Sequence, residues 1–398
     1  MSSFSSGKEL LGILRYILRL YVESGLELPP SNNTVETLLS ASKLEDVSNR
    51  ENLLVMAARL QLDPPDTRLR AEVVYQLSVM LRSQGRISDS ERVITEFFGN
   101  EDLDLNQESH FFLGLLHLSQ ANNQIYRFDF CKAREETRKW RSSSDNLSDS
   151  ELCLLCDQLY CNGRILKGEG LFNEARRCFE GCLTTRGLSR PKRVLIISHL
   201  SDIYCELDYM QRNVTLQSTH LKKGREAVQR EISRMRASVN PSKGLRRLLL
   251  SLVEIEIREG HLERAECLTI ELLGIYSRVA EPDVNDRVGH VQTLIARARI
   301  SQLDEAERHW HAVLLQNRAY NPLEEEVFTC GVIYLFMSSA RFQLGDIDGS
   351  RATFKKAVEV IRKKRPQFLM PGIGTYLFDN VKLELLSRAG WTLPKIAQ

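Results

Sequence analysis

One pattern recurs along this 398-residue chain and limits what it can fold into. A glycine or serine is followed two positions later by an apolar residue, five later by a small residue and nine later by a residue that is usually bulky. Glycine can end a helix in the left-handed conformation without a side-chain clash. The small residue lets a second helix cross close to the first, and the bulky one fills the space beside it. The pattern therefore predicts repeated helical hairpins.

Five segments carry the pattern most clearly, and their bounds are Leu77 to Phe98, Leu159 to Leu183, Ser251 to Leu273, Thr293 to Leu314 and Phe336 to Val358. The turn positions are Gly85, Gly170, Gly260, Ser301 and Gly345, and the apolar positions are Ile87, Phe172, Leu262, Leu303 and Ile347. The small positions are Ser90, Ala175, Ala265, Ala306 and Ser350, and the ninth positions are Ile94, Phe179, Thr269, Trp310 and Phe354. Only 11 prolines and 22 glycines interrupt the chain, which favours helix over strand.

The order of these residues resembles the second half of a tetratricopeptide repeat (TPR). The segment around Gly163 also matches the first half, with Leu159, Gly163 and Leu166 at the positions that the family conserves. Two weaker units run from Phe111 to Phe128 and from Leu200 to Leu216. With these included, successive turns lie about 36 to 52 residues apart, against ~34 in the family. The resemblance implies an all-α solenoid, a right-handed superhelix of stacked antiparallel helical hairpins.

We expect three regions. Residues 1–66 form an N-terminal helical cap, with helices at 8–24 and 34–62. Residues 67–365 form the TPR-like helical repeat array, which opens at an N-cap at Asp66 or Thr67. Residues 366–398 form a C-terminal capping helix, near Tyr376 to Arg388, and a tail that closes the apolar end of the array.

Composition excludes several classes of protein. Lys and Arg number 54 against 52 Asp and Glu, so a net charge of +2 gives no global attraction to nucleic acid or to an anionic membrane. No run of 18 apolar residues occurs, and Arg15 and Arg19 make the N-terminal segment amphipathic rather than a secretory signal. Nine cysteines within helical patterns indicate reduced thiols. We expect an intracellular protein, cytoplasmic, with the nucleus as the alternative.

The cysteines raise the question of a metal site. Cys153, Cys156, Cys178 and Cys182 have a spacing close to that of zinc ligands. Both pairs lie inside helical patterns, however, and Cys182 takes the small buried position of its unit, so thiols of the core are favoured. His309 and His311 are two apart and point to different helix faces. We therefore expect no metal and no cofactor.

No catalytic constellation stands out. The chain has no HExxH motif, no arrangement of Ser, His and Asp and no paired carboxylates in a recognisable motif. The segment GIGTYL, from Gly372 to Leu377, lacks the third glycine of a phosphate-binding loop. The sequence therefore predicts that the protein is not an enzyme.

Two basic clusters have no clear assignment from sequence. Residues Lys222 to Arg247 include nine Lys or Arg against two acids, and Arg362 to Arg365 is a run of four. Each could be a surface for an acidic partner or a nuclear-import signal, but a solvated helix face is favoured. Aromatic residues hardly interleave with the first cluster, which disfavours binding of single-stranded nucleic acid.

The resemblance implies that the first helix of each hairpin lines a concave groove. The residues expected to face a partner there are Tyr75, Arg82, Tyr160, Arg164, Lys167, Arg247, Glu254, Arg258 and Arg299. Such a surface suits a peptide segment or a partner protein. We expect a scaffold or adaptor for protein–protein interaction, acting as a regulator or complex subunit. The alternative is an accessory factor of an enzyme complex or biosynthetic pathway, and homo- or hetero-oligomers stay open.

Overall fold

Helices make up the regular structure throughout the described part of the chain. The computed structural model describes residues 31–42, 47–60, 66–99, 107–140, 148–186, 188–212, 219–236, 243–279, 282–301, 303–319 and 328–364. These ranges contain sixteen α-helices and no strand, which confirms the all-α prediction. The chain divides into two compact units, Met1–Leu154 and Leu155–Gln398.

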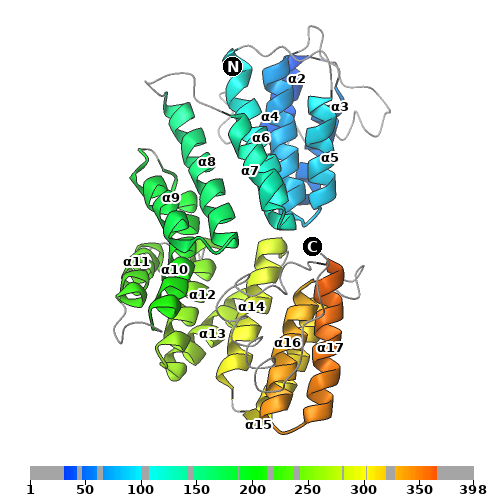
Figure 1. Cartoon of the computed structure of the whole chain (residues 1–398). Coiled ribbons are helices and arrows are strands. Elements are labelled where there is room, and N and C mark those ends of the chain that lie inside the picture. Colours follow the sequence, from blue (N-terminus) through cyan, green and yellow to red (C-terminus); the bar gives the residue numbers. More distant parts are fainter. Residues whose placement is uncertain are drawn as a thin grey trace, which may run out of the picture. The chain divides into compact units, whose positions relative to one another are not determined.

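The first unit is built from helical hairpins (Figure 1). The pairs are α2 (Asn32–Ser42) with α3 (Val47–Arg59), α4 (Thr67–Ser83) with α5 (Ile87–Phe98), and α6 (Gln107–Arg127) with α7 (Phe130–Lys139). The first helices α2, α4 and α6 contact one another in order. Asp66 caps α4, as expected, by accepting a hydrogen bond from the Leu69 amide at 2.8 Å.

The second unit repeats the arrangement along a longer stretch. Its helices are α8 (Asp149–Gly168), which begins in the first unit, α9 (Phe172–Thr184), α10 (Arg190–Arg212), α11 (His220–Arg236), α12 (Lys243–Arg258), α13 (Leu262–Tyr276), α14 (Val284–Ile300), α15 (Leu303–Ala319), α16 (Phe328–Gln343) and α17 (Ile347–Lys364). Each even-numbered helix pairs with the next, and the first helices α10, α12 and α14 contact in succession. Stacked antiparallel hairpins are thereby confirmed within the unit.

The repeated sequence pattern explains the hairpins at atomic detail. Gly85, Gly170, Gly260 and Gly345 all have φ between 79° and 85°, the left-handed conformation expected at the turn. The described small positions are fully buried: Ser90, Ala175, Ala265 and Ser350. The ninth positions are buried too: Ile94, Phe179, Thr269, Trp310 and Phe354. Each second helix therefore crosses its partner where a small side chain permits close approach.

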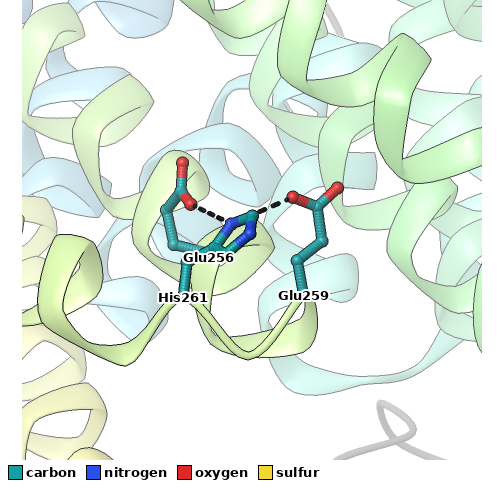
Figure 2. A group of neighbouring side chains, drawn as sticks. All are labelled: Glu256, Glu259 and His261. Carbon is teal, nitrogen blue, oxygen red and sulfur yellow. Dashed lines mark hydrogen bonds and ion pairs between the residues drawn. The ribbon is translucent and has the colours of Figure 1, made fainter.

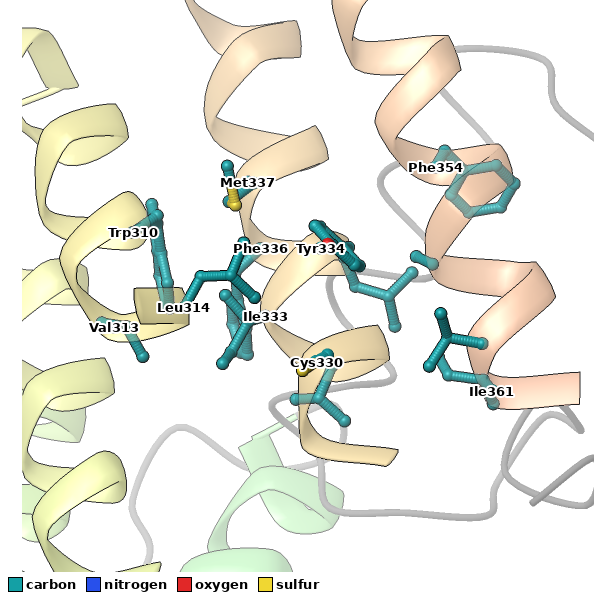
Figure 3. Close-up of a cluster of buried hydrophobic side chains, with 14 of the residues drawn as sticks. Trp310, Val313, Leu314, Cys330, Ile333, Tyr334, Phe336, Met337, Phe354 and Ile361 are labelled. Carbon is teal, nitrogen blue, oxygen red and sulfur yellow. The ribbon is translucent and has the colours of Figure 1, made fainter. Parts of the chain in front are cut away.

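The largest continuous core of the second unit spans its last two hairpins (Figure 3). Trp310 of α15 stacks on Phe336 of α16 with ring centroids 4.8 Å apart and planes within 5°. On the other side of α16, Phe354 and Ile361 of α17 join the same cluster. Most side chains from Cys330 to Ala340 are buried, so α16 is apolar on more than one face.

One of the five turns differs from the others. Ser301 has φ −70° and ψ 155°, so it ends α14 in an extended conformation rather than a left-handed one. The apolar side chains two after the turn are 48% exposed at Leu262 and 44% exposed at Ile347, because they stand at the hairpin tip and not between helices. The expected helices at 8–24 and near Tyr376 lie outside the described residues, and the three-region division stays a prediction. Within the described ranges no helix has the length and apolar character to cross a bilayer.

Candidate partner-binding surface

Polar side chains follow one face of successive first helices in the second unit. Tyr160, Arg164 and Lys167 of α8 are spaced by four and three residues, which places them on one helical face. α12 repeats this spacing between Arg247 and Arg258. We call the whole set the polar seam, and its members are Tyr160, Arg164, Lys167, Ser198, His199, Asp202, Glu206, Arg247, Ser251, Glu254, Arg258 and Arg299.

His199 of α10 connects α8 to α12. The hydroxyl of Tyr160 lies 3.1 Å from His199 Nε2, and Lys167 Nζ lies 3.4 Å from Nδ1. Arg247 Nη2 of α12 lies 3.4 Å from Nε2. Lys167 also forms an ion pair with Asp202, one turn further along α10. Three first helices are thus held together by polar contacts.

The protonation of His199 follows from its surroundings. Burial, followed by the charges of Lys167 and Arg247, lowers the pKa of His199 well below its usual value, so the ring is neutral. The Lys167 ammonium and the Arg247 guanidinium can only donate, and they approach different ring nitrogens, so the neutral ring accepts a hydrogen bond from one of the two. The ring stacks on Phe179 with centroids 5.2 Å apart, which fixes its plane.

Tyr160 packs inside the unit and offers little surface to a partner. Only 8% of it is exposed, and its ring lies between two cations, Lys192 Nζ at 4.2 Å and the Arg164 guanidinium at 5.8 Å from the centroid. Lys192 Nζ also lies 2.5 Å from Asp157 Oδ1. Burial lowers the pKa of Lys192, but Asp157 outweighs it and the pKa is raised. Tyr160 therefore supports the polar seam from within.

A buried ion network continues the polar seam from α10 to α14. Arg258 donates to Glu254 Oε1 at 2.8 Å and to the Cys205 carbonyl at 2.6 Å, and it lies 3.4 Å from Glu206 Oε1. Arg299 of α14 donates to Glu254 Oε2 at 2.6 Å. Burial raises the pKa of Glu254, but Arg299 and Arg258 outweigh burial and the pKa is lowered. Glu254 is therefore ionised and shared between two arginines.

The structure brings seven of the nine residues expected from sequence into the polar seam, where Tyr160 and the Arg258 side chain are buried. These are Tyr160, Arg164, Lys167, Arg247, Glu254, Arg258 and Arg299. Sequence reasoning missed the contribution of α10, because the segment from Leu200 counted as a weak unit. A signal was present: His199, Asp202 and Glu206 recur at helical spacing among apolar residues that are buried.

The other two expected residues lie in the first unit. Arg82 Nη1 of α4 donates to Ser119 Oγ at 2.7 Å and to Asn123 Oδ1 at 3.1 Å, both in α6. Tyr75 packs beside a small core that includes Ile94. Arg82 thus joins two first helices, as Arg247 and Arg258 do in the second unit.

The basic cluster from Lys222 to Arg247 does not form one patch. Arg246 donates to Asp286 at 2.5 Å, Lys243 to Asp283 at 2.6 Å and Arg236 to Glu271 at 2.8 Å. Lys222, Lys223 and Arg230 are exposed on α11. The exposed residues match a solvated helix face, and the others form ion pairs between neighbouring hairpins. Of the second cluster, Arg362 and Lys363 are exposed at the end of α17, and Arg365 lies outside the described residues.

One group of side chains has the spacing of metal ligands (Figure 2). His261 Nδ1 lies 2.9 Å from Glu256 Oε2 and 3.4 Å from Glu259 Oε2, at the turn between α12 and α13. The guanidinium of Arg225 in α11 forms ion pairs with both carboxylates. A divalent cation would have to displace Arg225, so this group is a clamp between α11 and the next hairpin.

The four cysteines of the zinc-like spacing do not share one environment. Cys182 and Cys156 are buried in the core between α8 and α9, where the Cys182 thiol donates to the Cys156 carbonyl at 3.4 Å. Cys178 is half-buried, and Cys153 is exposed. In the described residues, the group of Glu256, Glu259 and His261 is the single set of three such side chains whose ligand atoms lie within 4.8 Å, and it contains no cysteine.

The hairpins and their contacts define a TPR-like α-solenoid fold. A solved structure of a Rap protein complexed with Competence and Sporulation Factor has a TM-score of 0.55 with 10% identity, over 80% of this chain and 87% of that one. This likeness confirms the fold that the sequence resemblance implied.

Two further structures are similar over large parts of the chain. The APC/C hetero-tetramer Cut9-Hcn1 has a TM-score of 0.34 at 10% identity, covering 82% of this chain and 71% of that one. Naa15/Naa10 bound to HypK-THB has 0.24 at 12% identity, covering 93% and 54%. No family model matches the sequence. No curated protein matches it either.

Proposed function

We propose that this chain is a non-catalytic scaffold or adaptor that presents the polar seam to a peptide segment or partner protein, as a regulator or complex subunit. The observation that carries the proposal is the polar seam itself. Four successive first helices place polar side chains in contact with one another, and Arg164, Lys167, Asp202 and Arg247 among them are only half-buried. A solenoid uses a repeated, partly exposed face of this kind as an extended binding surface.

The chemistry of the polar seam supports binding rather than catalysis. Its single histidine, His199, is neutral, and both ring nitrogens contact protein side chains, Nδ1 with Lys167 and Nε2 with Tyr160 and Arg247, so neither nitrogen is positioned to take a proton from a substrate. Its carboxylates are held by cations in ion pairs such as those of Asp202 and Glu254. Side chains fixed in this way lose little freedom when a partner binds.

The test is capture of partners from an extract of the native cell. Arg164→Glu and Asp202→Lys together change the charge pattern on α8 and α10 at half-buried positions. We expect this double variant to retain its fold by circular dichroism and to lose a set of partners that the unchanged protein captures, measured by quantitative mass spectrometry.

The matched control lies on a different face. Lys222→Glu with Arg230→Glu changes the charge of the exposed side of α11, which is a second helix. We expect this control to capture the same partners as the unchanged protein. Undiminished capture by the polar-seam variant, or equal loss in both variants, would show that the polar seam is not the binding surface.

A further inference from the structure

The polar seam is charged unequally along its length. Between α8 and α12 it holds three cations, Arg164, Lys167 and Arg247, and one carboxylate, Asp202, which pairs with Lys167. At the other end, the two carboxylates Glu206 and Glu254 balance the two arginines Arg258 and Arg299. Among the members of the polar seam, cations therefore outnumber carboxylates at the end formed by α8, α10 and α12.

Arg247 contributes to this excess because its contacts are with uncharged side chains. Its Nε donates to Ser198 Oγ at 3.1 Å, and its Nη2 lies 3.4 Å from His199 Nε2. Both of these partners are uncharged, because the imidazole of His199 is neutral. Among the described residues Arg247 makes no ion pair, and its side chain is only half-buried.

The other arginines nearby in α12 and α14 contact carboxylates, unlike Arg247. Arg246, the adjacent residue of α12, donates to Asp286 at 2.5 Å, and Arg258 and Arg299 each contact Glu254. A partly buried guanidinium that faces only neutral groups forms strong, paired hydrogen bonds when a carboxylate reaches it. The position of Arg247 therefore fits an acidic ligand that comes from outside the described residues.

We propose that the polar seam binds an acidic segment of a partner polypeptide at this end, with a carboxylate side chain on Arg247 and further acidic residues beside Lys167 and Arg164. The proposal rests on the proposed function and names the chemistry of the partner. A single-stranded nucleic acid fits less well, because bases need open aromatic faces to stack on. Here Tyr160 and Phe179 are 8% and 0% exposed.

The test uses two labelled peptides of equal length. One is rich in glutamate, and the other has glutamine at the same positions. Fluorescence anisotropy with the full chain should show binding of the first peptide and much weaker binding of the second. Affinity for the acidic peptide should fall as salt rises from about 50 to about 300 mM, because the attraction is between charges.

Three variants assign the binding to Arg247. Arg247→Gln should weaken the acidic peptide roughly ten-fold or more, the usual value of a charge-assisted hydrogen bond. Arg247→Lys keeps the charge and should retain part of the affinity, while a common unfolding midpoint shows that the fold is unchanged. Arg230→Glu, on the exposed side of α11, should bind as the unchanged protein does.

Three results would overturn the proposal. They are equal binding of the two peptides, equal loss in the Arg247 and Arg230 variants, and tighter binding of an oligothymidylate that depends on Arg247. If any of these occurs while partner capture still depends on Arg164 and Asp202, the acidic ligand is wrong and the scaffold function stands. If capture is also independent of the polar seam, both proposals fail.

Discussion

Gly163 of α8 lies against the ring of Phe179 in α9. A Cβ at this position would be 2.9 Å from Phe179 Cζ, and the ring cannot easily move because Tyr160 and His199 pack on it. We expect Gly163→Ala to lower the free energy of unfolding by about 1 kcal/mol or more, despite the better helix propensity of alanine.

Gly274 of α13 provides the matched control for that substitution. A Cβ there would meet nothing within 4 Å, so Gly274→Ala should raise the free energy of unfolding by roughly 0.5–1 kcal/mol. Urea unfolding followed by circular dichroism measures both. The two substitutions are expected to change the free energy of unfolding in opposite directions. A stabilised Gly163→Ala would show that Phe179 does not constrain the approach of the helices.

His199 makes stability depend on pH. Its pKa is well below 6.5 in the folded protein, while the unfolded chain binds a proton near pH 6.5. The unfolded state therefore holds more protons below pH 6.5, and stability falls on acidification by at most about 1.4 kcal/mol per pH unit for this residue.

The variant His199→Gln should reduce that dependence. We expect the loss of unfolding free energy between about pH 7 and pH 5 to be smaller in the variant than in the unchanged protein, measured by urea unfolding at each pH. Part of the slope should remain, because the pKa values of His220 and His290 are lowered as well. Identical slopes would mean that His199 is protonated in the folded state.

The residues of the polar seam were predictable from sequence only where the repeat pattern was strong. Arg164 and Arg258 follow from helical spacing within clear units, and the structure places both in the polar seam. His199 and Asp202 lie in a helix whose unit is weak, so spacing alone did not select them. Which charge faces which depends on how two helices are rotated against each other, and a single-helix pattern does not contain that information.

At the scale of the element, the turn of each hairpin depends on backbone conformation. Gly260 has φ 79°, and a Cβ added there would meet no atom within 4 Å, so crowding plays no part. We expect Gly260→Ala to cost roughly 1–2 kcal/mol through the left-handed conformation alone. Thermal unfolding compared with Gly274→Ala, where φ is helical, measures this cost. A neutral Gly260→Ala would show that the turn adopts another conformation at little cost.

The contacts between hairpins depend on a few buried charges. Arg258→Ala would remove the cation that contacts Glu254 and the buried Glu206, which is 3% exposed, and we expect a loss of roughly 3–5 kcal/mol. Arg236→Ala removes a pair with Glu271 in which both side chains are exposed and should cost at most about 1 kcal/mol. Unfolding in urea compares the two, and equal losses would contradict a structural role for Arg258.

The hairpins themselves were largely predictable, because the residues that determine each hairpin lie close together in the sequence. A glycine at the turn and a small residue five later determine how two consecutive helices meet, and the buried Ala175 and Ala265 bear this out. The exposure of Leu262 and Ile347 was not predicted, because it depends on what packs on the hairpin tip and not on local spacing.

For the whole molecule, the cysteines give a simple check on the arrangement of helices. All nine are free thiols. Native labelling with iodoacetamide should modify the exposed Cys131, Cys153 and Cys267 first, and the buried cysteines only after unfolding. Mass spectrometry of peptides at timed intervals reads the order, and reducing agent should leave the unfolding midpoint unchanged. Early labelling of the buried Cys182 would contradict the packing of α8 on α9.

The ion pairs of the polar seam run between hairpins, and this limits how the second unit can be rearranged. Removing α10 and α11 would take away Asp202, which pairs with Lys167, and Glu206, which pairs with Arg258. Hairpins of similar shape are therefore not interchangeable modules here. A duplication or deletion of one hairpin would be tolerated only with compensating charge changes in both neighbours, so the order of the repeats is encoded in their charges as well as in their cores.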